Sequence, residues 1–231
     1  MAIPFFLAMT AAEFTKLSTL PPHLAWMACH FSPYGTGLTN LPKALPKNAL
    51  LILNDRTPLC GHDPETVTQM LLQTAEKFHS CGILLDLQRP GCEQVGSIIE
   101  KILTLPLPVA VSDLYALKYD CPVFLSPPPS HKVLADHIAP WQGREIWLEA
   151  ALDGCAITVT KEGSQVRLSS EISGDFPFQD ETRHCHYRIE TGHSQIRFFF
   201  HRTREDVADL LQEAEQLGIT HAVGLYQEFG K

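Results

Sequence analysis

Short apolar runs recur along the chain, and each of them ends on polar residues. Eight such runs stand at positions 5–10, 24–31, 49–55, 82–88, 108–113, 121–126, 145–151 and 221–226. Continuous apolar runs of this length are typical of strands that are buried on both faces in a parallel sheet. Eight parallel strands close most simply into a (β/α)8 barrel. The pattern therefore predicts an α/β protein with a TIM-barrel architecture.

Amphipathic segments predict helices between some of these strands. The clearest begins after Asp63, a good N-cap, with Pro64 at the first helical position. Another has its apolar residues at helical spacing, at Val95, Ile98, Ile99 and Ile102. Near the C-terminus, Thr203 and Asp206 form a cap pair, and Gly218 ends the helix. The links between the strands from 108 to 151 are too short for full helices, so we expect an irregular barrel.

The segment from 154 to 200 has a different periodicity. Apolar and polar residues alternate there with period two, with turns expected at 162–164 and at Gly192. This pattern predicts two hairpins that form a small antiparallel insert between the seventh strand and the last helix. We therefore expect a barrel domain of residues 1–153 and 201–231, and a β-rich insert of residues 154–200.

Composition and charge narrow the range of partners. The 231 residues are 45% hydrophobic, enough for a full core, and 18 Lys and Arg against 26 Asp and Glu give a net charge of −8. Because no stretch clusters basic with aromatic residues, we expect neither nucleic acid nor an anionic membrane as a partner. No apolar run approaches the roughly 18 residues of a membrane helix.

The cysteines and the N-terminal residues predict the cellular compartment of the protein. Seven cysteines, an odd number, are scattered through the chain, which favours free thiols in a reducing environment. The sequence HCH at 184–186 lacks the spacing of a zinc site, so we expect no metal and no cofactor. The apolar first residues have no basic region before them and are interpreted as a strand rather than a signal peptide. A cytoplasmic protein is expected.

One stretch carries a family resemblance. The sequence CGILLDLQRPG, residues 81–91, resembles the fourth-strand signature of the family 18 glycoside hydrolases, the chitinase-like barrels, which is commonly written DGIDIDWEYPG. The positions that match are Gly82, Ile83, Asp86, Pro90 and Gly91. The resemblance implies a (β/α)8 barrel and a saccharide ligand.

The chain departs from that signature at its acidic positions, including the catalytic one. Cys81 and Leu84 replace the first two acidic positions, and Gln88 stands where the family carries its catalytic Glu. In the family this Glu protonates the leaving oxygen, while the N-acetyl group of the substrate attacks the sugar carbon. A glutamine side chain hydrogen-bonds a sugar but has no proton to give. The resemblance therefore implies a barrel that has lost the acid of the family mechanism.

Two later segments resemble the same family. LEAALDG at 148–154 is similar to its seventh-strand pattern, and residues 186–230 resemble the closing segment of its spore-germination-type branch. Tyr226 falls near the Trp that floors the sugar subsite of the family. The sequence VFLSPPP, residues 123–129, stands where the family has a Met-x-Tyr-Asp motif, so the Tyr of that motif is absent.

Polar residues at the ends of the strands are the candidate site, because the carboxyl ends of barrel strands host the sites of this architecture. These candidates are Asn54, Asp55, Asp86, Gln88, Arg89, Asp113, Tyr115, Glu149, Tyr226 and Glu228. Structural roles compete with this interpretation. Asp86, Gln88 and Arg89 could form an internal polar network, and NDRTP at 54–58 could be a turn. His30 is more simply a core histidine, and the tryptophans are interpreted as packing residues.

The sequence is compatible with three functions. The first is a non-hydrolytic protein that binds a saccharide or peptidoglycan fragment in its cleft. The second is an active glycoside hydrolase in which another carboxylate, Glu149 or Glu228, has taken over as the acid. The third is a scaffold for partners that binds no sugar. The sequence leaves the oligomeric state open.

Overall fold

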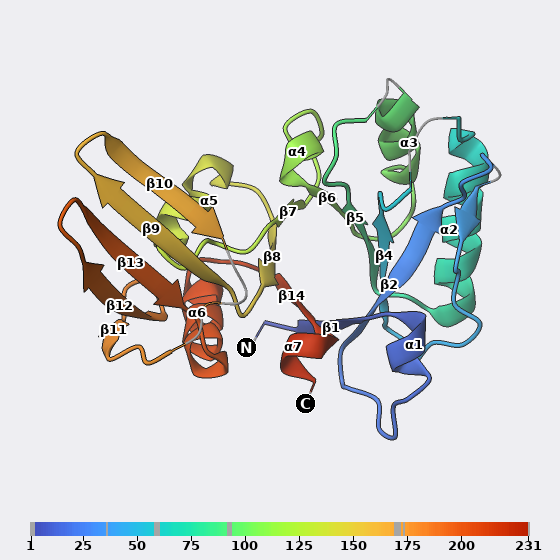
Figure 1. Cartoon of the computed structure of the whole chain (residues 1–231). Coiled ribbons are helices and arrows are strands. Elements are labelled where there is room, and N and C mark those ends of the chain that lie inside the picture. Colours follow the sequence, from blue (N-terminus) through green and yellow to red (C-terminus); the bar gives the residue numbers. More distant parts are fainter. Residues whose placement is uncertain are drawn as a thin grey trace. The chain divides into compact units, whose positions relative to one another are not determined.

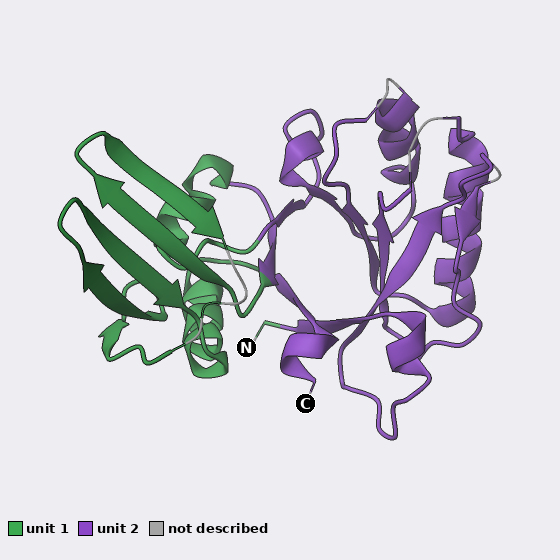
Figure 2. Ribbon diagram, in the orientation of Figure 1, with its two compact units in different colours: residues 1–3, 127–142, 150–219 green, residues 4–126, 143–149, 220–231 purple. Residues whose placement is uncertain are grey.

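The computed structural model describes residues 3–35, 37–57, 61–91, 94–168, 172 and 174–230. The chain forms two compact units, coloured separately in Figure 2. The barrel unit contains Pro4–Ser126, Gly143–Glu149 and Thr220–Lys231, and the sheet unit contains Met1–Ile3, Pro127–Gln142 and Ala150–Ile219. The division expected from the sequence, with an insert of residues 154–200 alone, stays a prediction.

The barrel unit has the eight parallel strands that the sequence predicts (Figure 1). Their order is β1-β14-β8-β7-β6-β5-β4-β2, and pairing of β1 with β2 closes the barrel. A short strand, β3 (Leu38–Thr39), adds to β2 in antiparallel fashion. The eight strands are β1 (Phe5–Met9), β2 (Leu24–Phe31), β4 (Leu50–Asn54), β5 (Gly82–Asp86), β6 (Val109–Ser112), β7 (Val123–Leu125), β8 (Ile146–Ala150) and β14 (His221–Leu225). The prediction of an irregular (β/α)8 fold is confirmed.

The helices of the barrel unit differ greatly in length. α2 (Pro64–Phe78) begins at the predicted cap, where Asp63 Oδ2 accepts a hydrogen bond of 2.9 Å from the Thr66 amide. In α3 (Gln94–Ile102) the four apolar residues of the predicted face are all buried. The other helices have four residues each, namely α1 (Ala11–Phe14), α4 (Asp113–Ala116) and α7 (Tyr226–Phe229). The short links predicted around β6 and β7 are thus present.

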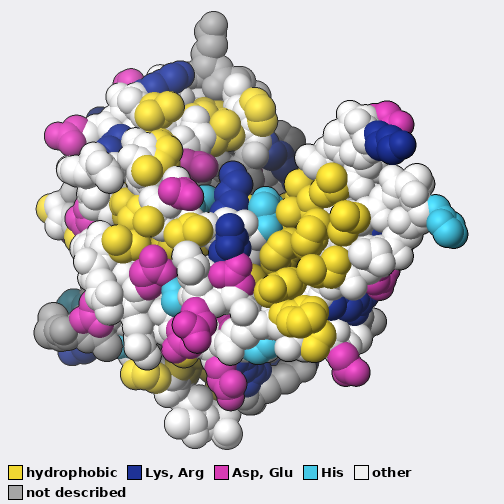
Figure 3. Space-filling model, turned by 90° about the vertical axis from the view of Figure 1, so that its left-hand side faces the viewer, with side chains coloured by type: hydrophobic (Ala, Val, Ile, Leu, Met, Phe, Trp, Pro, Cys, Tyr) yellow, Lys and Arg dark blue, Asp and Glu magenta, His cyan; other side chains and the backbone are white. Residues whose placement is uncertain are grey.

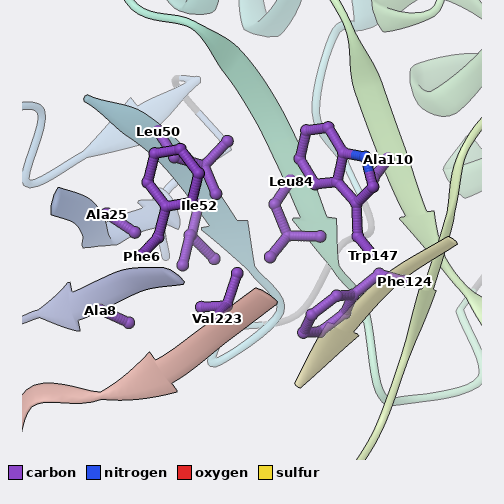
Figure 4. Close-up of a cluster of buried hydrophobic side chains, with 10 residues drawn as sticks. All are labelled: Phe6, Ala8, Ala25, Leu50, Ile52, Leu84, Ala110, Phe124, Trp147 and Val223. Atoms are coloured by element: carbon purple, nitrogen blue, oxygen red, sulfur yellow. The ribbon is translucent and has the colours of Figure 1, made fainter. Parts of the chain in front are cut away.

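Side chains from all eight strands fill the barrel (Figure 4). The largest is Trp147, whose ring lies 4.3 Å from that of His221 and whose Nε1 donates a 2.9 Å hydrogen bond to Glu145. Gly82 makes room for this indole, because a Cβ there would lie 3.1 Å from its ring. The buried cluster contains Phe6, Ala8, Ala25, Leu50, Ile52, Leu84, Ala110, Phe124, Trp147 and Val223. The barrel interior is therefore a packed core rather than a channel.

The sheet unit is built on the two predicted hairpins. Its five antiparallel strands have the order β10-β9-β13-β12-β11. Their bounds are β9 (Gly154–Thr160), β10 (Gly163–Leu168), β11 (Phe178–Asp180), β12 (Cys185–Thr191) and β13 (Gln195–His201). The unit also contains α5 (Leu134–Ile138), a single 3-10 turn (Ala139–Trp141) and α6 (Arg204–Gln216). The Thr203 and Asp206 cap pair at the start of α6 is present as predicted.

The cysteines of the described chain are free thiols, at Cys29, Cys81, Cys121, Cys155 and Cys185. Cys60 and Cys92 lie outside the described residues. Within the residues that the structure describes, no group of three or more His, Cys, Asp or Glu side chains is placed to hold a metal ion. No helix among them combines the length and the apolar character needed to cross a bilayer.

A buried arginine holds four segments of the sheet unit together. Arg202 is fully buried, and its Nη1 lies 3.1 Å from Asp153 Oδ1. The same guanidinium donates hydrogen bonds to the carbonyl oxygens of Pro128, Arg183 and His184, at 2.8 to 3.2 Å. A planar guanidinium can satisfy several acceptors at once, which a lysine cannot do. This side chain therefore fixes where β12 and β13 meet the loops before α5 and β9.

Replacing this arginine should destabilise the protein strongly. We expect Arg202→Met to lower the free energy of unfolding by about 3–5 kcal/mol, because it leaves Asp153 and three carbonyl groups without their donor. Arg202→Lys should recover little of this loss. The exposed Arg167 on β10 gives the matched control, and Arg167→Met should change stability by less than about 0.5 kcal/mol. Urea unfolding followed by circular dichroism measures all three, and equal midpoints for the two methionine variants would contradict the role given to Arg202.

Candidate functional site

Three polar side chains lie above the barrel core at the carboxyl ends of their strands. Successive side chains of a strand point to opposite faces, so a residue two positions beyond an inward residue also points inward. Asn54, Asp86 and Glu149 stand two positions beyond the core residues Ile52, Leu84 and Trp147. Asn54 and Asp86 are also directly opposite each other in the pairing of β4 with β5. The strand alternation alone thus brings these candidates together.

These three residues line a small cavity of about 40 Å³. Its other walls are apolar and come from β1, β2, β4, β5, β7 and β14, at Ala8, Met27, Ile52, Leu84, Phe124, Val223, Gly224 and Leu225. A cavity of this size holds one or two water molecules but not a sugar ring. Any larger ligand therefore has to bind above the cavity.

Glu149 has the most perturbed carboxyl group of the site. Burial among apolar walls and the nearby carboxylates of Asp86 and Glu228 together raise the pKa of Glu149 to about 7, and burial is the largest of these causes. Near neutral pH this side chain is thus partly protonated and can donate a proton. A carboxyl group with a pKa near the working pH is well suited to general acid catalysis.

Asp86 is hydrogen-bonded to the side chain of Gln88. Gln88 Nε2 donates a 2.7 Å hydrogen bond to Asp86 Oδ1. Burial raises the pKa of Asp86, and the charge of Asp55 adds to that effect, while the bond from Gln88 acts in the opposite direction. Gln88 itself is exposed beyond the end of β5. The pair joins the cavity to the surface of the barrel mouth.

The amide of Asn54 is held by its neighbours. His30 Nδ1 lies 2.7 Å from Asn54 Oδ1, and Asn54 Nδ2 donates a 3.0 Å hydrogen bond to the Met27 carbonyl oxygen. The Arg56 amide donates to the same Asn54 oxygen at 3.2 Å, which is the Asx turn considered for this segment. Asn54 therefore stabilises the turn after β4 and also lines the cavity.

Tyr115 and Asp55 hold the loop that follows β5. Tyr115 Oη donates a 2.6 Å hydrogen bond to the Arg89 carbonyl oxygen and accepts one of 2.6 Å from the Gly91 amide. Asp55 Oδ2 accepts a 2.7 Å hydrogen bond from the Arg89 amide. A Cβ at position 91 would collide with Val95, which explains the glycine. These candidates position the Gln88–Arg89 loop.

The remaining candidates stand at the ends of β6 and β14. Asp113 is the first residue of α4, and its Oδ1 accepts a 2.8 Å hydrogen bond from the Leu114 amide. Tyr226 begins α7 directly after β14 and packs against the buried residues Met9, Leu24 and Ala49. Glu228 is half-buried, and its charge contributes to the raised pKa of Glu149, so these two carboxyl groups belong to one acidic group. Asp113 is not among the residues that line the cavity.

Sequence reasoning missed two residues of this region. Ser112 is fully buried, and its Oγ donates to the Leu87 carbonyl oxygen at 2.6 Å and accepts from the Leu87 amide at 3.1 Å. Met27 lines the cavity and supplies the carbonyl that binds Asn54. Both stand two positions beyond a core residue of their strand, Ala110 for Ser112 and Ala25 for Met27, so the period-two pattern could have indicated them.

The raised pKa of Glu149 should appear in the pH dependence of stability. Its carboxyl group binds a proton more tightly in the folded state than in the unfolded chain, so stability falls as pH rises from about 4.5 to about 7. We expect Glu149→Gln to remove up to about 3 kcal/mol of this fall. Urea unfolding at several pH values measures the slope. The exposed Glu76 of α2 is the matched control, and an identical slope for Glu149→Gln and wild type would contradict the assignment.

The sequence matches no family model and no curated protein. Solved structures are similar in fold at low sequence identity. The spore cortex-lytic enzyme SleL of Bacillus cereus is 11% identical with a TM-score of 0.57, and the match covers 96% of this chain and 70% of that one. A chitinase of Chromobacterium violaceum is 10% identical with a TM-score of 0.54, over 96% and 93% of the two chains.

A third similar structure is a family 18 chitinase of Cycas revoluta, a double mutant in complex with (GlcNAc)4. It is 10% identical with a TM-score of 0.59, and the match covers 96% of this chain and 94% of that one. Chitinases and spore cortex-lytic enzymes thus share one architecture with this chain. The chain has the fold of the chitinase-like barrels of glycoside hydrolase family 18.

Proposed function

We propose that this protein binds a saccharide at the barrel mouth and does not hydrolyse it by the family 18 mechanism. The observation that carries this proposal is the exposed Gln88 hydrogen-bonded to Asp86. This proposal rests on the resemblance of residues 81–91 to the family signature, which implies that Gln88 stands where the family has its acid. A carboxamide has the size of a glutamate carboxyl group and both donates and accepts hydrogen bonds, but it cannot transfer a proton. The site is therefore suited to holding a sugar without cleaving it.

The ligand would lie across the mouth rather than inside the barrel. The cavity of about 40 Å³ is too small for a sugar ring. After β5, Gln88 and Arg89 are exposed. An amide and a guanidinium can hydrogen-bond sugar hydroxyl and acetamido groups. Tyr226 packs against Met9, Leu24 and Ala49 at outward positions of the strands, so its ring faces away from the barrel interior. Because Tyr115 and Asp55 hold the loop backbone, little ordering of that loop would be needed on binding.

The comparisons favour an oligomer of N-acetylglucosamine as the ligand. The Cycas revoluta chitinase was solved with (GlcNAc)4, and one of its two substitutions replaces a glutamate by a glutamine. That complex supports the proposal that a barrel of this fold can hold such an oligomer when a glutamine replaces a glutamate. Peptidoglycan contains the same sugar, so a peptidoglycan fragment belongs to the same ligand class.

Binding is tested with the tetramer of N-acetylglucosamine by isothermal titration calorimetry. Wild type should bind, and Gln88→Ala should weaken binding by about tenfold, because it removes the exposed amide that would hydrogen-bond the sugar. Gln73 is an exposed residue of α2, away from the carboxyl ends of the strands, so Gln73→Ala is the matched control and should bind like wild type. No binding by wild type would contradict a saccharide ligand and favour the scaffold.

A second function is supported by Glu149. This carboxyl group has a pKa of about 7 and stands beside Asp86, as a proton donor would. An active hydrolase that uses Glu149 or Glu228 in place of Gln88 is therefore the competing proposal. Its weakness is the position of Glu149 on the wall of a cavity too small for the glycosidic oxygen of a bound oligomer.

Release of chromophore from an aryl N-acetylglucosamine oligomer separates these two functions. We expect wild type and Gln88→Glu to stay near background. The general acid alone is worth about 10² to 10⁴ in rate, and Gln88→Glu does not restore the other missing groups of the family site. Turnover by wild type with a bell-shaped pH profile that disappears in Glu149→Gln would establish the competing function instead. Clear rescue by Gln88→Glu would show that only the acid is missing.

A further inference from the structure

The five-stranded sheet of the sheet unit has one strongly apolar face. Residues that are directly opposite each other in neighbouring strands share a face, so the register identifies its members. One row across four strands is Val166, Ile157, Phe198 and Ile189. The same face carries Val159, Leu168, Phe178, Tyr187, Ile196 and Phe200. We call these ten residues the apolar face.

Much of the apolar face is exposed. Val166 is 52% exposed, Leu168 66% and Phe178 48%. Val159, Ile189 and Ile196 are also exposed, while the other four members are half-buried. Figure 3 shows hydrophobic side chains gathered in one broad area of the face that it views. Antiparallel sheets that face water normally alternate apolar and polar residues with the polar side outward, so this exposure needs a cause.

The opposite face of the same sheet carries polar and charged side chains. It carries Thr158, Gln165, Glu190 and Arg197 at the alternating positions. Its aromatic residue Phe199 is covered by the guanidinium of Arg188, at 4.3 Å from the ring centroid. The two faces therefore differ in chemistry, and among the residues that the structure describes, the guanidinium that covers Phe199 has no counterpart over the exposed members of the apolar face.

The apolar face is hollowed along its aromatic residues. Ring centroids follow one another at 5.3 Å from Phe178 to Tyr187, 6.0 Å from Tyr187 to Phe200, and 6.3 Å from Phe200 to His131. The hollow has a volume of about 400 Å³. Val166 and Leu168, by contrast, stand on the edge strand β10 and protrude. The protruding side chains of Val166 and Leu168 in one copy can thus fill the aromatic hollow of a second copy.

Charge does not oppose contact between two such faces. In an isologous pair each patch meets itself, so an unpaired charge near its centre would meet a like charge. The charged residues beside the hollow are Asp180 and Arg183, and Arg183 Nη1 lies 2.6 Å from Asp180 Oδ2. Because they pair within one copy, a second copy meets a locally neutral surface.

The area is sufficient for a dimer. Five strands about 4.8 Å apart and about six residues long outline roughly 500 Å². Two such faces in contact would bury about 1,000 Å² or more, which is the lower bound for a specific interface. Sheets commonly pack face to face in this way, about 10 Å apart.

We propose that the apolar face binds a second copy of this chain in an isologous dimer. A two-fold axis along the central strand β13 places β10 of one copy over β11 and β12 of the other. Val166 and Leu168 of each copy then lie against the aromatic hollow of its partner. The contact converts two exposed sheet faces into one sandwich core.

The test is the molar mass of the full chain in solution. Sedimentation equilibrium from low to high micromolar concentration should show wild type at twice the chain mass of 25.7 kDa. Val166→Glu should remain a monomer at these concentrations, because it places a charge in the desolvated interface. Gln165→Glu is the matched control, since Gln165 is the adjacent exposed residue on the opposite face of β10, and it should dimerise like wild type.

Three results would overturn this proposal. They are a monomeric wild type over the whole concentration range, a dimer that persists in both Val166→Glu and Ile189→Glu, and equal loss of the dimer in Gln165→Glu. Circular dichroism confirms that each variant is folded, and Ile189→Glu on β12 gives a second, independent charge on the same face. A monomer that binds phospholipid vesicles through Val166 would assign the face to a lipid surface and would also overturn it.

Discussion

The alternation of side chains along a strand decides where the polar and apolar groups of this protein lie. In the barrel, every second residue points inward, and the inward positions run from core residues to Asn54, Asp86 and Glu149 as each strand reaches its carboxyl end. In the antiparallel sheet the same period separates the apolar face from a polar face. Site and surface thus follow from one geometric rule, applied to a closed sheet and to an open one.

Each unit has a buried ionisable side chain, and the two side chains have opposite electrostatic surroundings. Arg202 is fully buried, and its charge is met by Asp153 and three carbonyl oxygens. Glu149 faces apolar walls and two further carboxylates, so burial raises its pKa to about 7. The partners of Arg202 let its buried charge contribute to stability, whereas the ionised form of Glu149 lowers the free energy of unfolding above neutral pH. Groups that cost stability in this way are common at functional sites.

Much of this structure could be predicted from the sequence, because the signals are local. The eight strands, the Asp63 cap and both hairpins depend on neighbouring residues and are present as expected. The roles of Tyr115 and Asp55 could not be predicted, since each bonds a backbone more than twenty residues away. The raised pKa of Glu149 depends on burial and on the charges of Asp86 on β5 and Glu228 on α7, which lie far from it in sequence. The small size of the cavity likewise follows from packing rather than from any motif.

Barrel closure joins the most distant parts of the chain. β14 lies between β1 and β8 in the sheet, yet residues 151–220, most of which belong to the sheet unit, separate β8 from β14 in sequence. During synthesis the first seven barrel strands therefore emerge well before the strand that closes them. Until then β1 and β8 are edges with unpaired backbone groups, which are prone to pair with other chains. We expect folding to be slow at this step, because closure depends on contacts between residues far apart in sequence, and the nascent barrel to need protection from aggregation.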